Sequence, residues 1–189
     1  MALGLSRAQR CFRVSAAMEQ VGLPVAKPDR LILVRSDAAL PWGCYFVGEQ
    51  LTGSDLRSLC LEGIAGHEPK LTMAGAELAR LHEAGFVHGD CKWSNILFGS
   101  EGLFWLDLDN AGSYRKGRAA RDIARFVVNA EDFNASPAQL DGFLQAYCTG
   151  TKMEVATLLK WIARPLAKLR QRHSKTYGAR ASGYPRLNS

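Results

Sequence analysis

The residues best suited to chemistry lie close together near the middle of the chain: Asp90, Lys92, Asn95 and Asp107. A carboxylate can accept or orient the proton of an attacking hydroxyl group, and an amide oxygen with a second carboxylate can hold Mg²⁺ against phosphate groups. A lysine two residues beyond the first carboxylate can neutralise charge on a transferred phosphoryl group. This set predicts phosphoryl transfer, with Asp90 as the base, Lys92 at the phosphate, and Asn95 and Asp107 as metal ligands.

The segment from His88 to Asn95 resembles the catalytic loop of protein kinases, which has the pattern His-x-Asp-x-x-x-x-Asn. Gly89 stands where protein kinases carry arginine, so the cation that receives an activation-loop phosphate is missing. Taken alone, His-Gly-Asp is also compatible with a turn between a helix and a strand, in which the glycine supplies the bend. In the kinase interpretation, His88 belongs to the scaffold of the loop.

Two short apolar segments, 95–98 and 103–106, flank the turn residues 99–102 and predict a β-hairpin. The hairpin ends at Asp-Leu-Asp (107–109), which resembles the Asp-Phe-Gly segment of protein kinases. Asp109 replaces the glycine and is a candidate to assist the metal. Because the structural context that the motif requires is present on both sides, we favour the kinase interpretation over an accidental turn.

Among kinases of this fold, the chain is most similar to the lipopolysaccharide kinases, the Kdo and heptose kinase family, some of whose members carry solvent-tolerance or stress labels. Asp109 and the lack of an Ala-Pro-Glu segment set it apart from protein kinases. The resemblance covers about residues 6–126. It implies an α+β, protein-kinase-like fold, ATP and Mg²⁺ as cofactors, and phosphorylation of a sugar hydroxyl on the lipopolysaccharide core or another glycolipid. It also implies that Asp122 braces the catalytic loop, the alternative being an ordinary acid in the first turn of a helix.

The start of the chain departs from the kinase pattern. A helix is predicted over residues 6–21, but kinases place a glycine-rich loop and a strand lysine ahead of this helix. The segment 25–27, Val-Ala-Lys, follows the helix, so we interpret Lys27 as a surface residue. Either about fifty residues of the N-lobe precede Met1 in a longer reading frame, or the chain handles nucleotide poorly.

In the kinase interpretation, the first helix offers an acid to the nucleotide-binding lysine. Glu19 is the only acid on it and lies in its last turn, so we favour a solvated helix end for this side chain. The position expected for the family's acid lies nearer Cys11.

Strands are predicted over residues 31–34 and 42–47, as an antiparallel pair. The segment 48–53 then resembles the kinase hinge, where backbone groups meet adenine, and Glu49 and Leu51 are the expected carriers of those contacts. A plain turn between strand and helix is an equal alternative.

Helical periodicity and capping residues predict the remaining elements. Helices are expected over 55–61 with Ser54 as the N-cap, and over 70–84, 119–133, 138–147 and 152–173. The expected organisation is a truncated N-lobe over 1–53, a helical C-lobe over 54–173, and a basic, disordered tail over 174–189.

Charge is concentrated at the end of the chain. The net charge is +6, and residues 152–189 hold nine basic side chains and one acidic one. A basic helix and tail suit an anionic membrane surface, and a merely solvated tail is an equal alternative. No aromatic interleaving or motif supports binding to nucleic acid.

The five cysteines form no Cys-x-x-Cys pair, and the chain shows neither a secretory signal nor an apolar run of about 18 residues. A reducing cytoplasm is therefore expected, with peripheral contact to the inner membrane as an option. Two other functions stay open: a pseudokinase or stress-related binding protein, since the glycine-rich loop and lysine are missing, and a kinase that phosphorylates protein.

Overall fold

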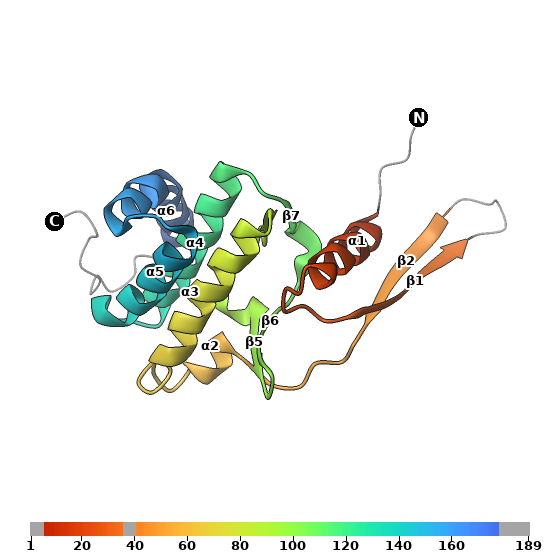
Figure 1. Cartoon of the computed structure of the whole chain (residues 1–189), viewed down its shortest axis with the longest axis horizontal. Helices are drawn as coiled ribbons and strands as arrows, with labels where there is room; N and C mark the ends of the chain where they lie inside the picture. Colours follow the sequence, from red (N-terminus) through yellow and green to blue (C-terminus); the bar gives the residue numbers. More distant parts are fainter. Residues whose placement is uncertain (1–5, 36–40, 178–189) are drawn as a thin grey trace.

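The structure is a computed structural model that describes residues 6–35 and 41–177. Figure 1 shows helix α1 (Arg7–Gln20) and the hairpin of β1 (Pro28–Arg35) and β2 (Pro41–Gly48) on one side of the molecule. The long helices lie on the other side: α3 (Glu68–Glu83), α4 (Lys116–Asp132), α5 (Pro137–Thr151) and α6 (Val155–Tyr177).

Helix α1 begins at a capping box. The Ser6 hydroxyl accepts the Gln9 backbone N–H, and the Gln9 side chain accepts the Ser6 N–H. These bonds satisfy two amide groups that have no partner inside the helix. The helix packs on the hairpin, with the rings of Phe12 and Phe46 edge to face at 5.9 Å. The helix predicted over 6–21 is confirmed.

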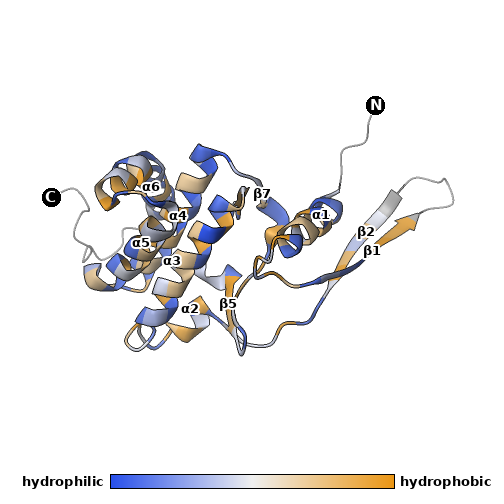
Figure 2. Ribbon diagram, in the orientation of Figure 1, coloured by the Kyte–Doolittle hydropathy of each residue, from blue (hydrophilic) through white to orange (hydrophobic). Residues whose placement is uncertain are grey.

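The β1–β2 pair is antiparallel, with Leu31 opposite Phe46 and Leu33 opposite Cys44. The predicted strands are therefore confirmed, and each is longer than expected. Ile32, Leu33 and Tyr45 are exposed, and Figure 2 shows the hydrophobic part of β1 standing clear of the helices.

Three short strands form the sheet between the two sides of the molecule: β3 (Ser54–Asp55), β5 (Ile96–Gly99) and β6 (Gly102–Trp105). The predicted β5–β6 hairpin is confirmed, with Ile96 opposite Trp105. The predicted N-cap at Ser54 is wrong, because Ser54 pairs with Phe98 in the sheet. Asp55 takes that role for α2 (Leu56–Leu59) and accepts the Ser58 N–H at 3.0 Å.

The long helices share one apolar core, in which the rings of Phe126 and Phe143 stack at 3.8 Å. Helices α3 and α5 touch at Gly75, where any side chain would collide with the carbonyl group of Phe143. Helix α4 begins three residues earlier than predicted, and α5 continues through Gly150. Helix α6 includes Pro165 and extends past the predicted end at His173, so the first residues of the expected tail are helical; residues 178–189 lie outside the described part.

The remaining elements are short. Strand β4 (Phe86–Val87) pairs with β7 (Gly112–Ser113), and two 3₁₀ turns, η1 (Trp93–Asn95) and η2 (Leu108–Asn110), follow β4 and β6. The five cysteines are free thiols. Among the described helices, none combines the length and the apolar character needed to cross a membrane.

Candidate active site

The predicted catalytic loop lies between β4 and η1. Gly89 has φ +80°, a left-handed conformation that glycine adopts without strain. A side chain at this position would also collide with the carbonyl group of Asn110. This close approach explains why an arginine cannot stand here.

Asp122, on α4, lies beneath the loop and is 1% exposed. Its carboxylate accepts the backbone N–H groups of His88 at 2.8 Å and Gly89 at 2.9 Å. His82 Nε2 lies 3.5 Å from the same carboxylate, and His82 Nδ1 lies 2.8 Å from the Tyr147 hydroxyl. A buried polar network thus joins α3, α4 and α5 to the loop, with the contacts that the expected brace requires.

His88 is fully buried and lies edge to face against Trp105, with ring centroids 5.4 Å apart. Its Nδ1 accepts the Asp90 backbone N–H at 3.3 Å, so the ring holds the loop from within. Burial lowers the pKa of His88, and the nearby Asp122 carboxylate opposes this effect only in part.

The lowered pKa of His88 predicts that acid destabilises the fold. The unfolded chain binds a proton near pH 6.5, whereas the folded protein keeps this imidazole neutral to lower pH. The free energy of unfolding should therefore fall as pH drops below about 6.5, by at most about 1.4 kcal/mol per pH unit from this group. Urea unfolding at several pH values between about 7 and 5 should give a smaller slope for His88→Gln than for the wild type. Equal slopes would contradict this assignment.

Asp90 lies at the surface end of the loop, with its side chain 13% exposed. Lys92 Nζ is 3.2 Å from Asp90 Oδ2, and Arg125 Nη1 pairs with Oδ1. No pattern in the sequence alone indicates a role for Arg125. It lies three residues after Asp122 on α4, and residues at this spacing share one helical face. A helix that presents Asp122 to the loop therefore presents Arg125 as well, and this is the signal that could have identified it.

The two expected metal ligands, Asn95 and Asp107, lie at the open end of the β5–β6 hairpin, Asn95 just before β5 and Asp107 two residues after β6. Asn95 Nδ2 donates to the Asp90 carbonyl oxygen at 3.0 Å, which leaves Oδ1 as the atom able to bind a cation. The Leu106 N–H donates to the Asn95 carbonyl at 2.9 Å and so brings Asp107 alongside. Asp107 is exposed and has φ 54° and ψ 61°, a strained conformation for a non-glycine residue that clusters at functional sites.

Asp109, which was expected to assist the metal, already has a cationic partner in the protein. Its carboxylate forms an ion pair with Arg7 of α1, so assistance to a metal would have to compete with this arginine. Across 6–35 and 41–177, no group of three or more His, Cys, Asp or Glu side chains is arranged to hold a metal ion. Asn95 and Asp107 nevertheless fit Mg²⁺, which is commonly bound by one or two protein oxygen ligands together with substrate phosphates.

Helix α1 presents a thiol to this segment. Cys11 is buried close to Asp107 and Asp109, and its pKa is raised, first by burial and then by the Asp109 charge. In the kinase interpretation, the acid of this helix was expected nearer Cys11 than Glu19. Glu19 is exposed in the last turn of α1, in agreement with the expected solvated end.

The expected hinge, 48–53, begins with the last residue of β2 and then has no regular structure until β3 begins. The Glu49 N–H donates to the Lys27 carbonyl at 2.8 Å. Because this N–H already has an acceptor in the protein, it is not available to adenine. Of the backbone groups expected to meet adenine, the Glu49 carbonyl and the groups of Leu51 remain as candidates. Lys27 is exposed, as predicted.

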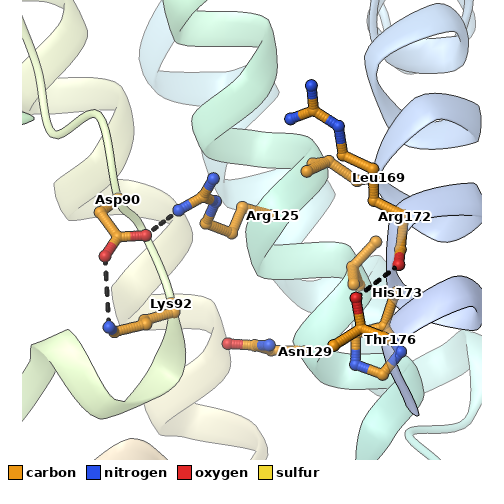
Figure 3. Close-up of a pocket in the computed structure, with 9 residues that line it drawn as sticks. Asp90, Lys92, Arg125, Asn129, Leu169, Arg172, His173 and Thr176 are labelled. Atoms are coloured by element: carbon orange, nitrogen blue, oxygen red, sulfur yellow. Dashed lines mark hydrogen bonds and ion pairs between the residues drawn. The ribbon is translucent and has the colours of Figure 1, made fainter.

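A pocket of about 320 Å³ opens beside Asp90. Its walls come from the catalytic loop, α4 and the C-terminal part of α6, and Figure 3 shows the Asp90 carboxylate between Lys92 and Arg125. The basic composition of α6 predicts contact with a membrane surface or with solvent and does not predict this wall. The complete lining is Asp90, Lys92, Arg125, Val128, Asn129, Leu169, Arg172, His173 and Thr176.

Comparisons with known proteins identify the family and the fold of the chain. The sequence profile of the family described as Lipopolysaccharide kinase (Kdo/WaaP) matches residues 1–147. One curated relative, a probable bifunctional tRNA threonylcarbamoyladenosine biosynthesis protein of Methanosarcina barkeri (strain Fusaro / DSM 804), is 36% identical over 83 residues. That match covers 43% of this chain and 15% of the relative's length.

Two solved structures have the same fold. The structure titled WaaP in complex with acyl carrier protein has a TM-score of 0.67 and 20% identity, covering 90% of this chain and 76% of that one. Amicoumacin kinase hAmiN, in complex with AMP-PNP, Ca²⁺ and Ami, has a TM-score of 0.65 and 15% identity, covering 92% and 70%. The predicted protein-kinase-like fold is confirmed.

Proposed function

From the fact that this chain belongs to the lipopolysaccharide kinase (Kdo/WaaP) family, we propose that it transfers the γ-phosphate of ATP to a sugar hydroxyl of the lipopolysaccharide core. The observation that carries the proposal is the Asp90 carboxylate, which faces a sugar-sized pocket and is held by Arg125 and Lys92. The kinase activity follows from the family. The acceptor and the roles of the residues are our proposal.

Asp90 accepts the proton of the acceptor hydroxyl as the oxygen attacks phosphorus. Arg125 holds Oδ1, and Asn95 lies 3.4 Å from Oδ2, so the carboxylate has one fixed orientation toward the pocket. Fixing the base in this way removes part of the entropic cost of the reaction.

Lys92 stabilises the phosphoryl group during transfer. Its side chain is 42% exposed and its ion pair with Asp90 is 3.2 Å long, so the ammonium group can move from Asp90 to a phosphate within the pocket. Lysine suits this role because its compact charge sits on a flexible stem.

Asn95 Oδ1 and Asp107 would hold Mg²⁺, which would neutralise charge on the ATP phosphates. Glu49 and Leu51 contribute backbone groups to the adenine contact. The committed Glu49 N–H leaves its carbonyl oxygen for this purpose.

Calorimetric titration of the chain with ATP and Mg²⁺ tests the nucleotide site. The wild type should bind, and Asp107→Ala should weaken binding by about tenfold or more, since a charged metal contact is worth more than about 1.4 kcal/mol. Asp141→Ala is the matched control, because Asp141 is an exposed acid on α5. Equal affinities of the wild type and Asp107→Ala would contradict the metal role.

Failure of both proteins to bind ATP would instead support a pseudokinase or binding protein. If ATP does bind, transfer of labelled phosphate to lipopolysaccharide core supports the proposed acceptor. Transfer to protein would support the protein-kinase alternative.

A row of cations on α6 supports a peripheral contact with the anionic surface of the inner membrane. Lys160, Arg164, Lys168 and Arg172 are spaced four residues apart and all are exposed. Residues at this spacing share one helical face, and each basic residue near an anionic surface contributes about 1 kcal/mol.

Vesicle sedimentation tests this contact. Neutralising Lys160, Lys168 and Arg164 together to Gln should lower partitioning onto phosphatidylglycerol vesicles by about a hundredfold. Neutral phosphatidylcholine vesicles should bind neither protein. Equal partitioning of the wild type and the triple variant would place the membrane contact elsewhere.

A further inference from the structure

The segment that begins with Asp107 lies between helices from the two sides of the molecule. This metal turn, residues 107–111, follows β6; Figure 1 shows it in green beside α1, and it leads through β7 into α4. Helix α1 packs on its η2 part, where Leu108 is buried. Asp107 has φ 54° and ψ 61°, and a strained backbone of this kind persists only where the surrounding structure holds it.

One contact that holds the metal turn comes from α1. The guanidinium group of Arg7 forms an ion pair with the Asp109 carboxylate. Arg7 is the first residue of the helix and directly follows Ser6, whose capping box fixes this end of the backbone. The ion pair therefore joins a well-defined helix end to the turn.

The second contact comes from α4. The guanidinium group of Arg118 donates to the Asn110 carbonyl oxygen. The same group lies against Gly89 of the catalytic loop, since a Cβ atom at position 89 would be 2.9 Å from Arg118 Nη2. The catalytic loop, the metal turn and α4 thus meet at Arg118. Protein kinases carry an arginine at the position of Gly89, so Arg118 supplies a guanidinium group beside a position that lacks one.

We infer that Arg7 and Arg118 form an arginine clamp, which holds the metal turn against the catalytic loop and keeps Asp107 in its metal-binding conformation. Both are positioning residues, and neither lines the pocket beside Asp90. The inference rests on the proposed metal role of Asp107 and adds the contacts that fix this ligand. In protein kinases, arginine–phosphate pairs order the activation loop after phosphorylation. The clamp binds the turn directly and needs no phosphate group.

The two halves of the clamp differ in expected strength. The Arg7 side chain is 73% exposed and that of Asp109 is 26% exposed, and exposed ion pairs contribute little to stability. Arg118 is half-buried and donates from a charged group to a backbone carbonyl, which is a stronger kind of hydrogen bond. Arg118 should therefore be the more important half.

Amide hydrogen exchange tests the clamp without metal or nucleotide. The Ala111 N–H donates to the Leu108 carbonyl at 2.9 Å, so its exchange rate reports opening of the turn. Arg118→Met keeps an unbranched stem without the donors and should speed this exchange by about tenfold or more. Arg7→Met should speed it by about two- to fivefold. Exchange of the amides in α5 should stay at the wild-type rate.

Titration with Mn²⁺, followed by electron paramagnetic resonance, tests the effect on the metal site. Mn²⁺ prefers the same oxygen ligands as Mg²⁺. Arg118→Met should weaken Mn²⁺ binding by about fivefold or more, and Arg118→Lys, which keeps a charged donor, should recover part of the affinity. Loss of a positive charge near a cation site would by itself strengthen binding of the metal. Weaker binding therefore reports the lost position of Asp107.

Each half of the clamp has a matched control on its own helix. Arg121→Met removes an exposed cation of α4 that donates only within the helix, to the Gly117 carbonyl at 3.2 Å. Arg13→Met removes an exposed cation of α1. Both controls should match the wild type in exchange at Ala111 and in Mn²⁺ affinity. All of these variants should unfold close to the temperature of the wild type, because none of them changes the core.

Three results would overturn the inference: wild-type exchange at Ala111 in Arg118→Met, Mn²⁺ affinity of Arg118→Met equal to or above that of the wild type, or wild type that binds Mn²⁺ no better than Asp107→Ala. None of these depends on phosphoryl transfer. A chain that binds Mn²⁺ through the clamped turn but never phosphorylates a sugar would contradict the proposed function and leave the clamp standing.

Discussion

Asp90→Asn should lower the rate of phosphoryl transfer by about 10² to 10⁴, the usual contribution of a positioned general base. Asparagine has the same shape and can keep a contact with Asn95, but it cannot take the proton of the acceptor hydroxyl. It also leaves Arg125 without its carboxylate partner. Initial rates with labelled ATP and a purified acceptor measure the effect directly.

The variant must be shown to be folded. Its far-UV circular dichroism spectrum and its affinity for ATP with Mg²⁺ should remain close to those of the wild type, because Asn95 and Asp107 are unchanged. Asp141→Asn, which removes an exposed carboxylate far along the chain, should transfer phosphate at the wild-type rate. Asp90→Asn with more than a tenth of the wild-type rate would show that Asp90 is not the base.

Asp122→Ala should lower the free energy of unfolding by about 2 to 5 kcal/mol, because it leaves two buried N–H groups without an acceptor at about 1 to 3 kcal/mol each. Those groups belong to His88 and Gly89, and the loss also removes the carboxylate 3.5 Å from His82. Urea denaturation at neutral pH measures the change. Transfer activity should fall with it, since the loop loses its support.

Asp141→Ala is the comparison for this variant, since a surface substitution usually changes stability by less than about 0.5 kcal/mol. Similar unfolding midpoints for Asp122→Ala and Asp141→Ala would mean that the loop does not depend on α4. Asp122→Asn separates charge from hydrogen bonding, because one amide oxygen can still accept from the loop. It should lie between the wild type and Asp122→Ala in stability.

The sequence was most informative where the contacts are local. Asn95 donates to Asp90 only five residues away, and the β5–β6 hairpin joins residues that a four-residue turn brings together. Spacing and alternation therefore predicted the hairpin and placed Asp90 and Asn95 in one loop, although the hydrogen bond between them was not predicted. The pairings of Asp90 with Arg125 and of Asp109 with Arg7 span 35 and 102 positions. No local pattern contains such contacts, because they depend on how whole helices dock.

The ends of helices also depend on contacts that a local sequence pattern does not contain. Ser54 has the right chemistry for an N-cap, but its backbone pairs with Phe98 in a strand. Asp55 therefore caps the helix instead. Helix α6 extends past His173 since its inner face packs on α4. A polar, basic composition predicted a solvated tail there. Tertiary packing overrides such preferences.

The brace under the catalytic loop has a consequence for the nascent chain. His88 receives its support from Asp122, 34 positions later in the sequence. A ribosome adds roughly 5–20 residues per second, so the catalytic loop, 88–95, is synthesised about one to seven seconds before the carboxylate that shapes it. The loop and the α4 helix must therefore fold as one unit, and a chain released before α4 would carry the complete motif without the arrangement needed for catalysis.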